Sequence, residues 1–131
     1  ICIFLSLLDC HIARNPILSK LKETRYYPGK FKFANSTECI ENERLYMHLE
    51  LPSSQNVVLI LFAGFIARRI IPFVSKGDTL DIGQRIGIIK FGSRIDIYVP
   101  EDYITDIKAG DEVIAGETIL FSKKNKENVL K

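Results

Sequence analysis

The chain has 131 residues, enough for one domain built around a single hydrophobic core. Hydrophobic residues make up 47% of it and charged residues 26%, which is ordinary for a globular protein. The net charge of +2 is too small to create the strong positive field of a nucleic-acid-binding protein, so we expect no nucleic-acid partner.

The N-terminal residues form an apolar run from Ile1 to Leu8. This run is much shorter than the roughly 20 apolar residues that a membrane-spanning helix needs. It also lacks the basic segment that opens a signal peptide. Because the chain begins at Ile1 inside this run, we expect it to be a piece of a longer protein, with any membrane anchor upstream.

Three segments have the pattern of β-strands. Apolar and polar residues alternate over residues 44–51 and 94–99, which predicts strands with one buried and one polar face. Residues 57–62 form a continuous apolar run, which predicts a strand buried on both faces. Residues 34–42 lack a clear period and are interpreted as a loop or a short helix. The sequence therefore predicts a mainly β fold with little helix.

Turn signals separate these strands, and two of them belong to an internal repeat. Residues 77–86 match residues 110–119 at an offset of 33 residues. Each copy is predicted to consist of a Gly-Asp turn, a short apolar stretch, a Gly turn and a strand. Such paired units resemble the two halves of barrel-sandwich hybrid domains, so we expect sheets of that kind.

The cysteines do not suggest a metal site. Cys2, Cys10 and Cys39 are odd in number, and none stands in a CxxC pair. A zinc site would need more ligands, at tighter spacing, than Cys10, His11 and Cys39 offer. We expect three reduced thiols and no metal.

The most informative segment is the Gly92-Ser93 pair between two apolar strand runs. Taken alone, a Gly-Ser pair indicates a tight hairpin turn, in which glycine allows a positive φ and serine bonds to the backbone. Its surroundings change this interpretation. Residues 88–100 resemble the processing site of the short form of the phosphatidylserine decarboxylase family, whose Phe-Gly-Ser-Arg core corresponds to residues 91–94.

Three further blocks resemble the same family, in the family's order, and the resemblance extends to about Phe121. They are Phe4-Leu5-Ser6 with His11 and Pro16, then Tyr27-Pro28-Gly29-Lys30-Phe31 with Glu41-Asn42-Glu43-Arg44, and last Ala63-Gly64-Phe65-Ile66-Ala67-Arg68-Arg69-Ile70. The resemblance implies one catalytic domain over residues 1–131 that cuts itself between Gly92 and Ser93. Residues 1–92 would become the β chain and residues 93–131 the α chain.

The resemblance also implies a covalent pyruvoyl cofactor made from Ser93. The serine hydroxyl would attack the Gly92 carbonyl, and elimination and hydrolysis would leave a ketone at the new N-terminus. This ketone would react with the amine of phosphatidylserine and take up electrons as CO2 leaves, giving phosphatidylethanolamine. The expected location is the cytoplasmic side of the cell membrane, as a peripheral protein. An archaeal ether lipid with a serine headgroup would offer the same chemistry, and association of several copies stays open.

Roles for four other residues follow from their places in these blocks. His11 is the expected general acid or base, because histidine titrates near neutral pH. Arg68, Arg69 and Arg94 are candidates for binding the substrate phosphate or carboxylate. Outside the blocks, a lone histidine is more often a surface or satisfied core residue, and an arginine pair is more often solvated. His48 on the polar face of a strand is assigned no role.

Two other functions remain open on the sequence alone. The internal repeat is compatible with a non-catalytic barrel-sandwich carrier, although Lys90 does not stand in the setting of a modifiable lysine. An inactive relative is the second alternative, because Arg14 replaces a histidine that helps to activate the serine in the better-known branch of the family.

Overall fold

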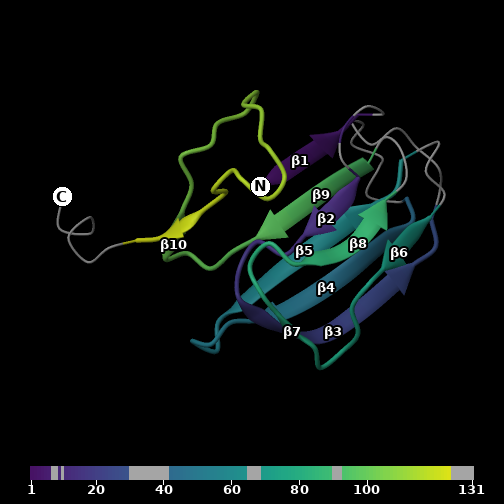
Figure 1. Ribbon diagram of the computed structural model, residues 1–131, viewed down its shortest axis with the longest axis horizontal. Coiled ribbons are helices and arrows are strands. Elements are labelled where there is room, and N and C mark those ends of the chain that lie inside the picture. The colour runs from purple at the N-terminus through teal and green to yellow at the C-terminus, as the bar shows by residue number, and fades with distance from the viewer. Residues whose placement is uncertain (7–8, 10, 30–41, 65–68, 90–92, 125–131) are drawn as a thin grey trace.

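A computed structural model describes residues 1–6, 9, 11–29, 42–64, 69–89 and 93–124. Gly92, Arg68, Lys90, Cys10, Cys39 and all but the last residue of the segment 34–42, predicted as a loop or a short helix, lie outside the described residues. In the described part of the chain all regular structure is β-strand, which confirms the mainly β prediction (Figure 1). It holds no helix that is long and apolar enough to cross a membrane.

Within the described residues, six strands form the larger sheet, in the order β1-β9-β5-β4-β3-β7 and with antiparallel neighbours. Their bounds are β1 (Cys2–Leu5), β3 (Ser19–Tyr27), β4 (Arg44–Glu50), β5 (Asn56–Phe62), β7 (Thr79–Leu80) and β9 (Ser93–Tyr98). A smaller sheet has the order β2-β8-β6, with β2 (Ile12–Arg14), β6 (Ile70–Pro72) and β8 (Arg85–Ile89). Strands β10 (Tyr103–Ile104) and β11 (Ser122–Lys123) pair with each other beside the two sheets.

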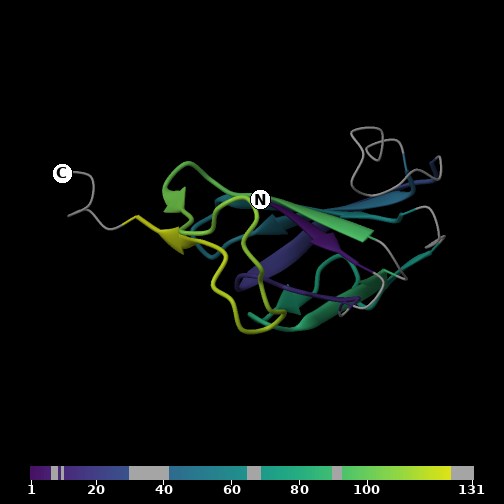
Figure 2. The ribbon, with the colours of Figure 1, turned by 90° about the horizontal axis from the view of Figure 1, so that it is seen from above.

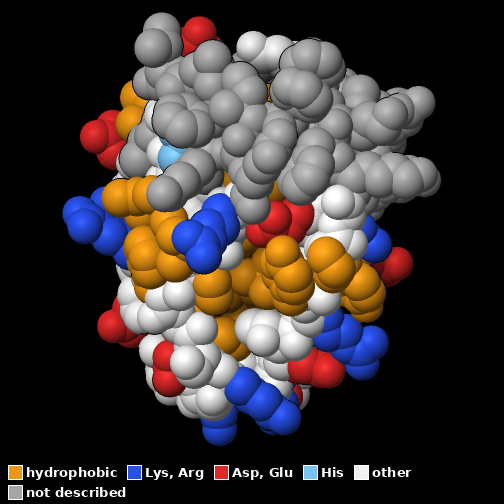
Figure 3. Space-filling model, turned by 90° about the vertical axis from the view of Figure 1, so that its right-hand side faces the viewer, with side chains coloured by type: hydrophobic (Ala, Val, Ile, Leu, Met, Phe, Trp, Pro, Cys, Tyr) orange, Lys and Arg blue, Asp and Glu red, His pale blue; other side chains and the backbone are white. Residues whose placement is uncertain are grey.

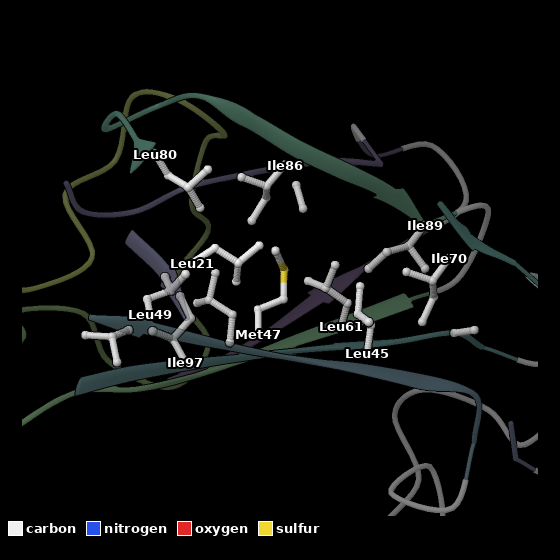
Figure 4. Close-up of a cluster of buried hydrophobic side chains, with 14 of the residues drawn as sticks. Leu21, Leu45, Met47, Leu49, Leu61, Ile70, Leu80, Ile86, Ile89 and Ile97 are labelled. Carbon is white, nitrogen blue, oxygen red and sulfur yellow. The ribbon is translucent and has the colours of Figure 1, made fainter. Parts of the chain in front are cut away.

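The two sheets lie face to face, and the core fills the space between them (Figure 2). Leu45, Met47 and Leu49 alternate along β4 and point into this space, as their period of two predicted. Side chains from β6 and β8, such as Ile70 and Ile89, meet them from the smaller sheet (Figure 4). The apolar run at β5 is also confirmed, because both Ile60 and Leu61 are buried on opposite faces of that strand.

The internal repeat is confirmed in its turns. Gly77 and Gly110 have φ of 96° and 95°, and Gly83 and Gly116 have φ of 79° and 77°. In both copies the aspartate after the first glycine accepts a hydrogen bond from the backbone N–H three residues earlier, at 2.8 Å. The two copies therefore share one local conformation, set by glycines that occupy the left-handed region.

The strand predicted after the Gly turn of the second copy is shorter and begins later than in the first copy. In the first copy, residues 85–89 form β8 between β2 and β6. In the second copy, residues 118–121 form no regular strand, and only β11 (Ser122–Lys123) pairs, with β10. Strand β9 differs from its predicted pattern in a smaller way, because Asp96 on its polar face is buried.

Candidate active site

Ser93 is the first residue of β9 and is fully buried. It pairs with Leu5 at the end of β1. Because successive side chains of a strand alternate between faces, Ser93 lies on the same face of β9 as Ile95 and Ile97. That face looks toward the smaller sheet, so the Ser93 hydroxyl points into the space between the sheets.

His11 approaches Ser93 from the other sheet. It directly precedes β2, and its carbonyl oxygen accepts a hydrogen bond from the backbone N–H of Ile89 on β8 at 3.0 Å. Its Nδ1 lies 3.3 Å from the Oγ of Ser93. The tautomer of the ring decides which atom donates, but either arrangement places an imidazole where it can exchange a proton with the hydroxyl. The structure thus brings together two of the predicted site residues.

Arg94 does not join this pair. Since it follows Ser93 on β9, its side chain lies on the opposite, outer face of the larger sheet. Its Nε and one NH2 group donate to the two carboxylate oxygens of Asp96, at 2.6 and 2.8 Å. The burial of Asp96, unexpected from the alternation, is explained by this two-bond ion pair.

Arg69 is exposed and lies at the same end of the molecule as Ser93. It precedes Ile70, whose register partner on β8 is Ile89, the residue bonded to His11. The N–H of Ile70 donates to a carboxylate oxygen of the buried Glu43 at 2.9 Å, which fixes the backbone beside Arg69. Arg69 therefore directly precedes β6, whose neighbour β8 is bonded to His11, and Arg68 lies outside the described residues.

An apolar cavity of about 260 Å³ lies between the two sheets, and its lining includes chain neighbours of the pair but neither Ser93 nor His11. Leu5 and Ile12, the neighbours of Ser93 and His11, line one part of it. Two polar residues also line the cavity: Arg14, the last residue of β2, and Asn15, which follows it. The cavity is otherwise lined mainly by aliphatic side chains of both sheets and by residues 113–121.

Arg14, noted from the sequence only as the replacement of a family histidine, and Asn15 were assigned no site role there. Arg14 donates to the carbonyl oxygen of Gly83 at 2.9 Å, and its side chain packs against Gly116. Asn15 is buried, and its Nδ2 donates to the carbonyls of Leu80 and Asp81 at 3.1 and 3.0 Å. Together they fix β2 against the turns of the repeat. Besides the histidine that Arg14 replaces, the signal in the sequence was a pair of polar residues just before Pro16, within an otherwise apolar stretch.

Two other expectations concern cysteines and surface residues. Cys2 is a free thiol, as expected. The pKa of its thiol is raised, first by burial and second by the nearby carboxylate of Asp96.

His48 lies on the outer face of β4, and its Nε2 is 2.8 Å from the Oδ1 of Asn56. This agrees with a structural place on the polar face of the strand.

Comparison with known proteins shows the family of the chain that carries the Ser93–His11 pair. The family model described as phosphatidylserine decarboxylase matches residues 1–121. The chain belongs to the phosphatidylserine decarboxylase family. Among curated relatives, it is 43% identical over 121 residues to the phosphatidylserine decarboxylase proenzyme of Erythrobacter litoralis, covering 92% of this chain and 49% of that protein.

Other members of the phosphatidylserine decarboxylase family are similar to the same extent. The proenzyme of Novosphingobium aromaticivorans is 44% identical over 119 residues, covering 90% of this chain and 47% of that protein. The proenzyme of Ruegeria pomeroyi is 40% identical, covering 92% of this chain and 55% of that protein. The chain thus spans about half the length of the curated relatives that it matches. No solved structure matches it.

Proposed function

We propose that this chain is the catalytic region of a pyruvoyl-dependent phosphatidylserine decarboxylase that makes its cofactor from Ser93. The observation that supports this most directly is the 3.3 Å separation between the buried Ser93 Oγ and His11 Nδ1, in a chain of this family. A serine hydroxyl is a weak nucleophile at neutral pH, and an adjacent imidazole that accepts its proton activates it.

In the proposed self-cleavage, His11 accepts the Ser93 proton as Oγ attacks the carbonyl carbon of Gly92. The Oγ–C bond forms and the Gly92–Ser93 peptide C–N bond breaks, so that an ester replaces the amide. Loss of the Ser93 α-proton then breaks the Cβ–Oγ bond, releasing the Gly92 carboxylate and leaving a dehydroalanyl residue. Water replaces the nitrogen of residue 93, ammonia leaves, and a ketone remains. Residues 1–92 and 93–131 would then be the two chains of one catalytic domain.

The buried position of Ser93 fits a group of this kind. Residue 93 is held by pairing with Leu5, and its hydroxyl has the His11 imidazole beside it. It shares a face of β9 with Ile95 and Ile97, which line the apolar cavity. When formed, a pyruvoyl group supplies a carbonyl that reacts with the substrate amine and accepts the electrons of the bond to CO2. The task of His11 is then to move a proton at residue 93, in an environment from which its neighbours partly exclude water.

The proposed substrate is phosphatidylserine, and an ether lipid with the same serine headgroup is the alternative. We propose that Arg69 binds its phosphate or carboxylate, because Arg69 is exposed and near the His11 side of the pair. Arg68 is the other candidate from the same block. The protein would work at the cytoplasmic surface of the cell membrane, because a phospholipid leaves the bilayer only at the cost of exposing its acyl chains.

The test is the mass and the N-terminus of the purified complete protein. We expect two chains, cut between Gly92 and Ser93, and we expect sequencing of the second chain from its N-terminus to be blocked, because a pyruvoyl group has no amine. Ser93→Ala should stay in one piece, whereas Ser53→Ala, at an exposed turn, should cleave normally. A free serine at the new N-terminus would mean ordinary proteolysis and would contradict the proposal.

A further inference from the structure

Arg94 is surrounded by partners on the outer face of the larger sheet. Besides its two bonds to Asp96, its NH2 donates to the Sγ of Cys2 at 3.4 Å. Its guanidinium lies 5.6 Å from the ring centroid of Phe4 and 5.3 Å from that of Phe62. Phe4 and Phe62 are also its register partners on the two neighbouring strands, β1 and β5. One side chain therefore connects three adjacent strands.

These contacts make Arg94 unsuitable as a substrate ligand. The Ser93 hydroxyl and His11 are on the inner face of the sheet, whereas the Arg94 guanidinium is on the outer face. If it turned to a substrate phosphate, it would leave the carboxylate of Asp96, which is only 3% exposed, without its counter-ion. An unpaired buried charge is strongly unfavourable. The same contacts suit a different role.

That role follows from the way in which β9 begins. Among the described residues, Ser93 has a register partner only on β1, whereas Arg94 has partners on both β1 and β5. Once the peptide bond before Ser93 is cut, residue 93 becomes a chain end, and chain ends fray unless they are held. Arg94 is the first residue of the new chain that is held from both sides.

We infer that Arg94 is a positioning residue: its contacts with Asp96, Phe4 and Phe62 hold residue 93 beside His11 after the chain has been cut. This inference depends on the proposed function, because it concerns the cleaved protein. It predicts that Arg94 matters more after cleavage than before it, since the uncut chain is also held through Gly92.

The experiment compares Arg94→Met, which removes the guanidinium, and Arg94→Lys, which keeps only the charge, in the complete protein. Cleavage is followed by intact mass, and hydrogen exchange is measured at the amides of residues 94–98. The same substitutions in an uncleavable Ser93→Ala background show the effect before cleavage. Arg25→Met is the matched control, because Arg25 also pairs with an acidic residue two positions away on a strand, but both side chains are exposed.

We expect Arg94→Met to raise exchange over residues 94–98 much more in the cleaved protein than in the Ser93→Ala background. Its kcat should fall by roughly 10²-fold, the scale of a small misplacement of reacting groups, with KM for phosphatidylserine little changed. Arg94→Lys should behave similarly, because an ammonium cannot make both bonds to Asp96. Arg25→Met should change none of these quantities.

Three results would overturn the inference. The first is an increase in KM with kcat unchanged, which would mean that Arg94 contacts the substrate. The second is an equal change in hydrogen exchange before and after cleavage, which would mean a general stabilising role. The third is no change in hydrogen exchange in either state. A wild-type protein that stays in one piece would instead overturn the proposed function, and this inference with it. If Arg94→Met does not fold, Arg94→Lys and Asp96→Asn provide the same comparison.

Discussion

His11 and Ser93 are 82 residues apart in the chain, yet His11 Nδ1 and Ser93 Oγ are 3.3 Å apart. Each belongs to a different sheet. Ser93 begins β9 of the larger sheet, and His11 is bonded through its carbonyl to Ile89 of the smaller one. The pair therefore depends on the packing of one sheet against the other at the end where β9 begins.

The first prediction concerns His11. His11→Ala should lower decarboxylation by roughly 10²–10⁴-fold, the usual effect of losing a general acid or base. Activity should be compared per cleaved molecule, with cleavage measured by intact mass, because His11 also faces the Ser93 hydroxyl before cleavage. His48→Ala is the control, since His48 lies on the outer face beside Asn56. Normal turnover in fully cleaved His11→Ala would assign His11 a structural role.

The second prediction concerns Glu43, which supports the backbone beside Arg69. Its carboxylate accepts the buried N–H of Ile70, and its carbonyl accepts the N–H of Ala63. Glu43→Leu should destabilise the protein by about 1–3 kcal/mol in urea unfolding, because the Ile70 N–H loses its acceptor. Glu43→Gln keeps an oxygen in place and should cost clearly less. Equal losses in the two variants would show that the charge, and not the acceptor, matters.

The third prediction distinguishes two reasons why a position requires glycine, a positive φ and a lack of space for a Cβ. Gly83 has φ of 79° with open space where a Cβ would lie, so Gly83→Ala should cost about 1–2 kcal/mol through backbone strain alone. At Gly87 a Cβ would lie 3.0 Å from the carbonyl oxygen of Ile71, so Gly87→Ala must push β8 and β6 apart. Asparagine, which tolerates a positive φ, should partly restore stability at Gly83 and not at Gly87. Urea unfolding of the four variants measures this, and rescue at both positions would be inconsistent with it.

The fourth prediction concerns pH and the turn before His11. The hydrogen bond from the Ser6 backbone N–H, at 2.7 Å, holds the pKa of Asp9 below its ordinary value. A carboxylate with a lower pKa in the folded state stabilises that state above its unfolded pKa, and the contribution is lost as the pH falls through the folded pKa. Asp9→Asn should therefore be less stable than wild type at neutral pH, with a difference that shrinks below about pH 4. Because Asp9 is exposed, the effect should be small, and a difference that grows on acidification would argue against this bond.

The fifth prediction concerns membrane contact. Figure 3 shows apolar side chains gathered across the end of the molecule where β9 begins, with Lys and Arg side chains beside them. Phe62 is buried on the outer face of β5 beside Arg94, and Ile70 is buried in the core between the sheets. Phe4, the register partner of Arg94, and Tyr26, near the end of β3, are 52% and 54% exposed. We expect weak, salt-dependent co-sedimentation with vesicles of phosphatidylglycerol and phosphatidylcholine.

Substitution of the two exposed aromatic residues tests this surface directly. Phe4→Ser combined with Tyr26→Ser should reduce vesicle binding, because aromatic side chains favour the membrane interface. Ile119→Ser, which removes an exposed apolar residue of the second repeat copy, should leave binding unchanged. Tight binding that high salt and the double substitution leave intact would place the contact elsewhere.

Local patterns in the sequence determined much of the fold. The alternation over residues 44–51 predicted which side chains of β4 are buried, because the side-chain period of a strand is set by its own backbone. The glycines of the repeat predicted four turns for the same kind of reason, since a positive φ is a property of single residues. The Gly92-Ser93 motif and its companion blocks also predicted the family.

Only the tertiary structure decided how distant residues meet. It placed His11 beside Ser93, paired the buried Asp96 with the guanidinium of Arg94, and left the second repeat copy with only the short strand β11 where the first copy forms β8. Each of these depends on which strands become neighbours. That choice is made by the packing of side chains far apart in the sequence, and no local period or propensity records it.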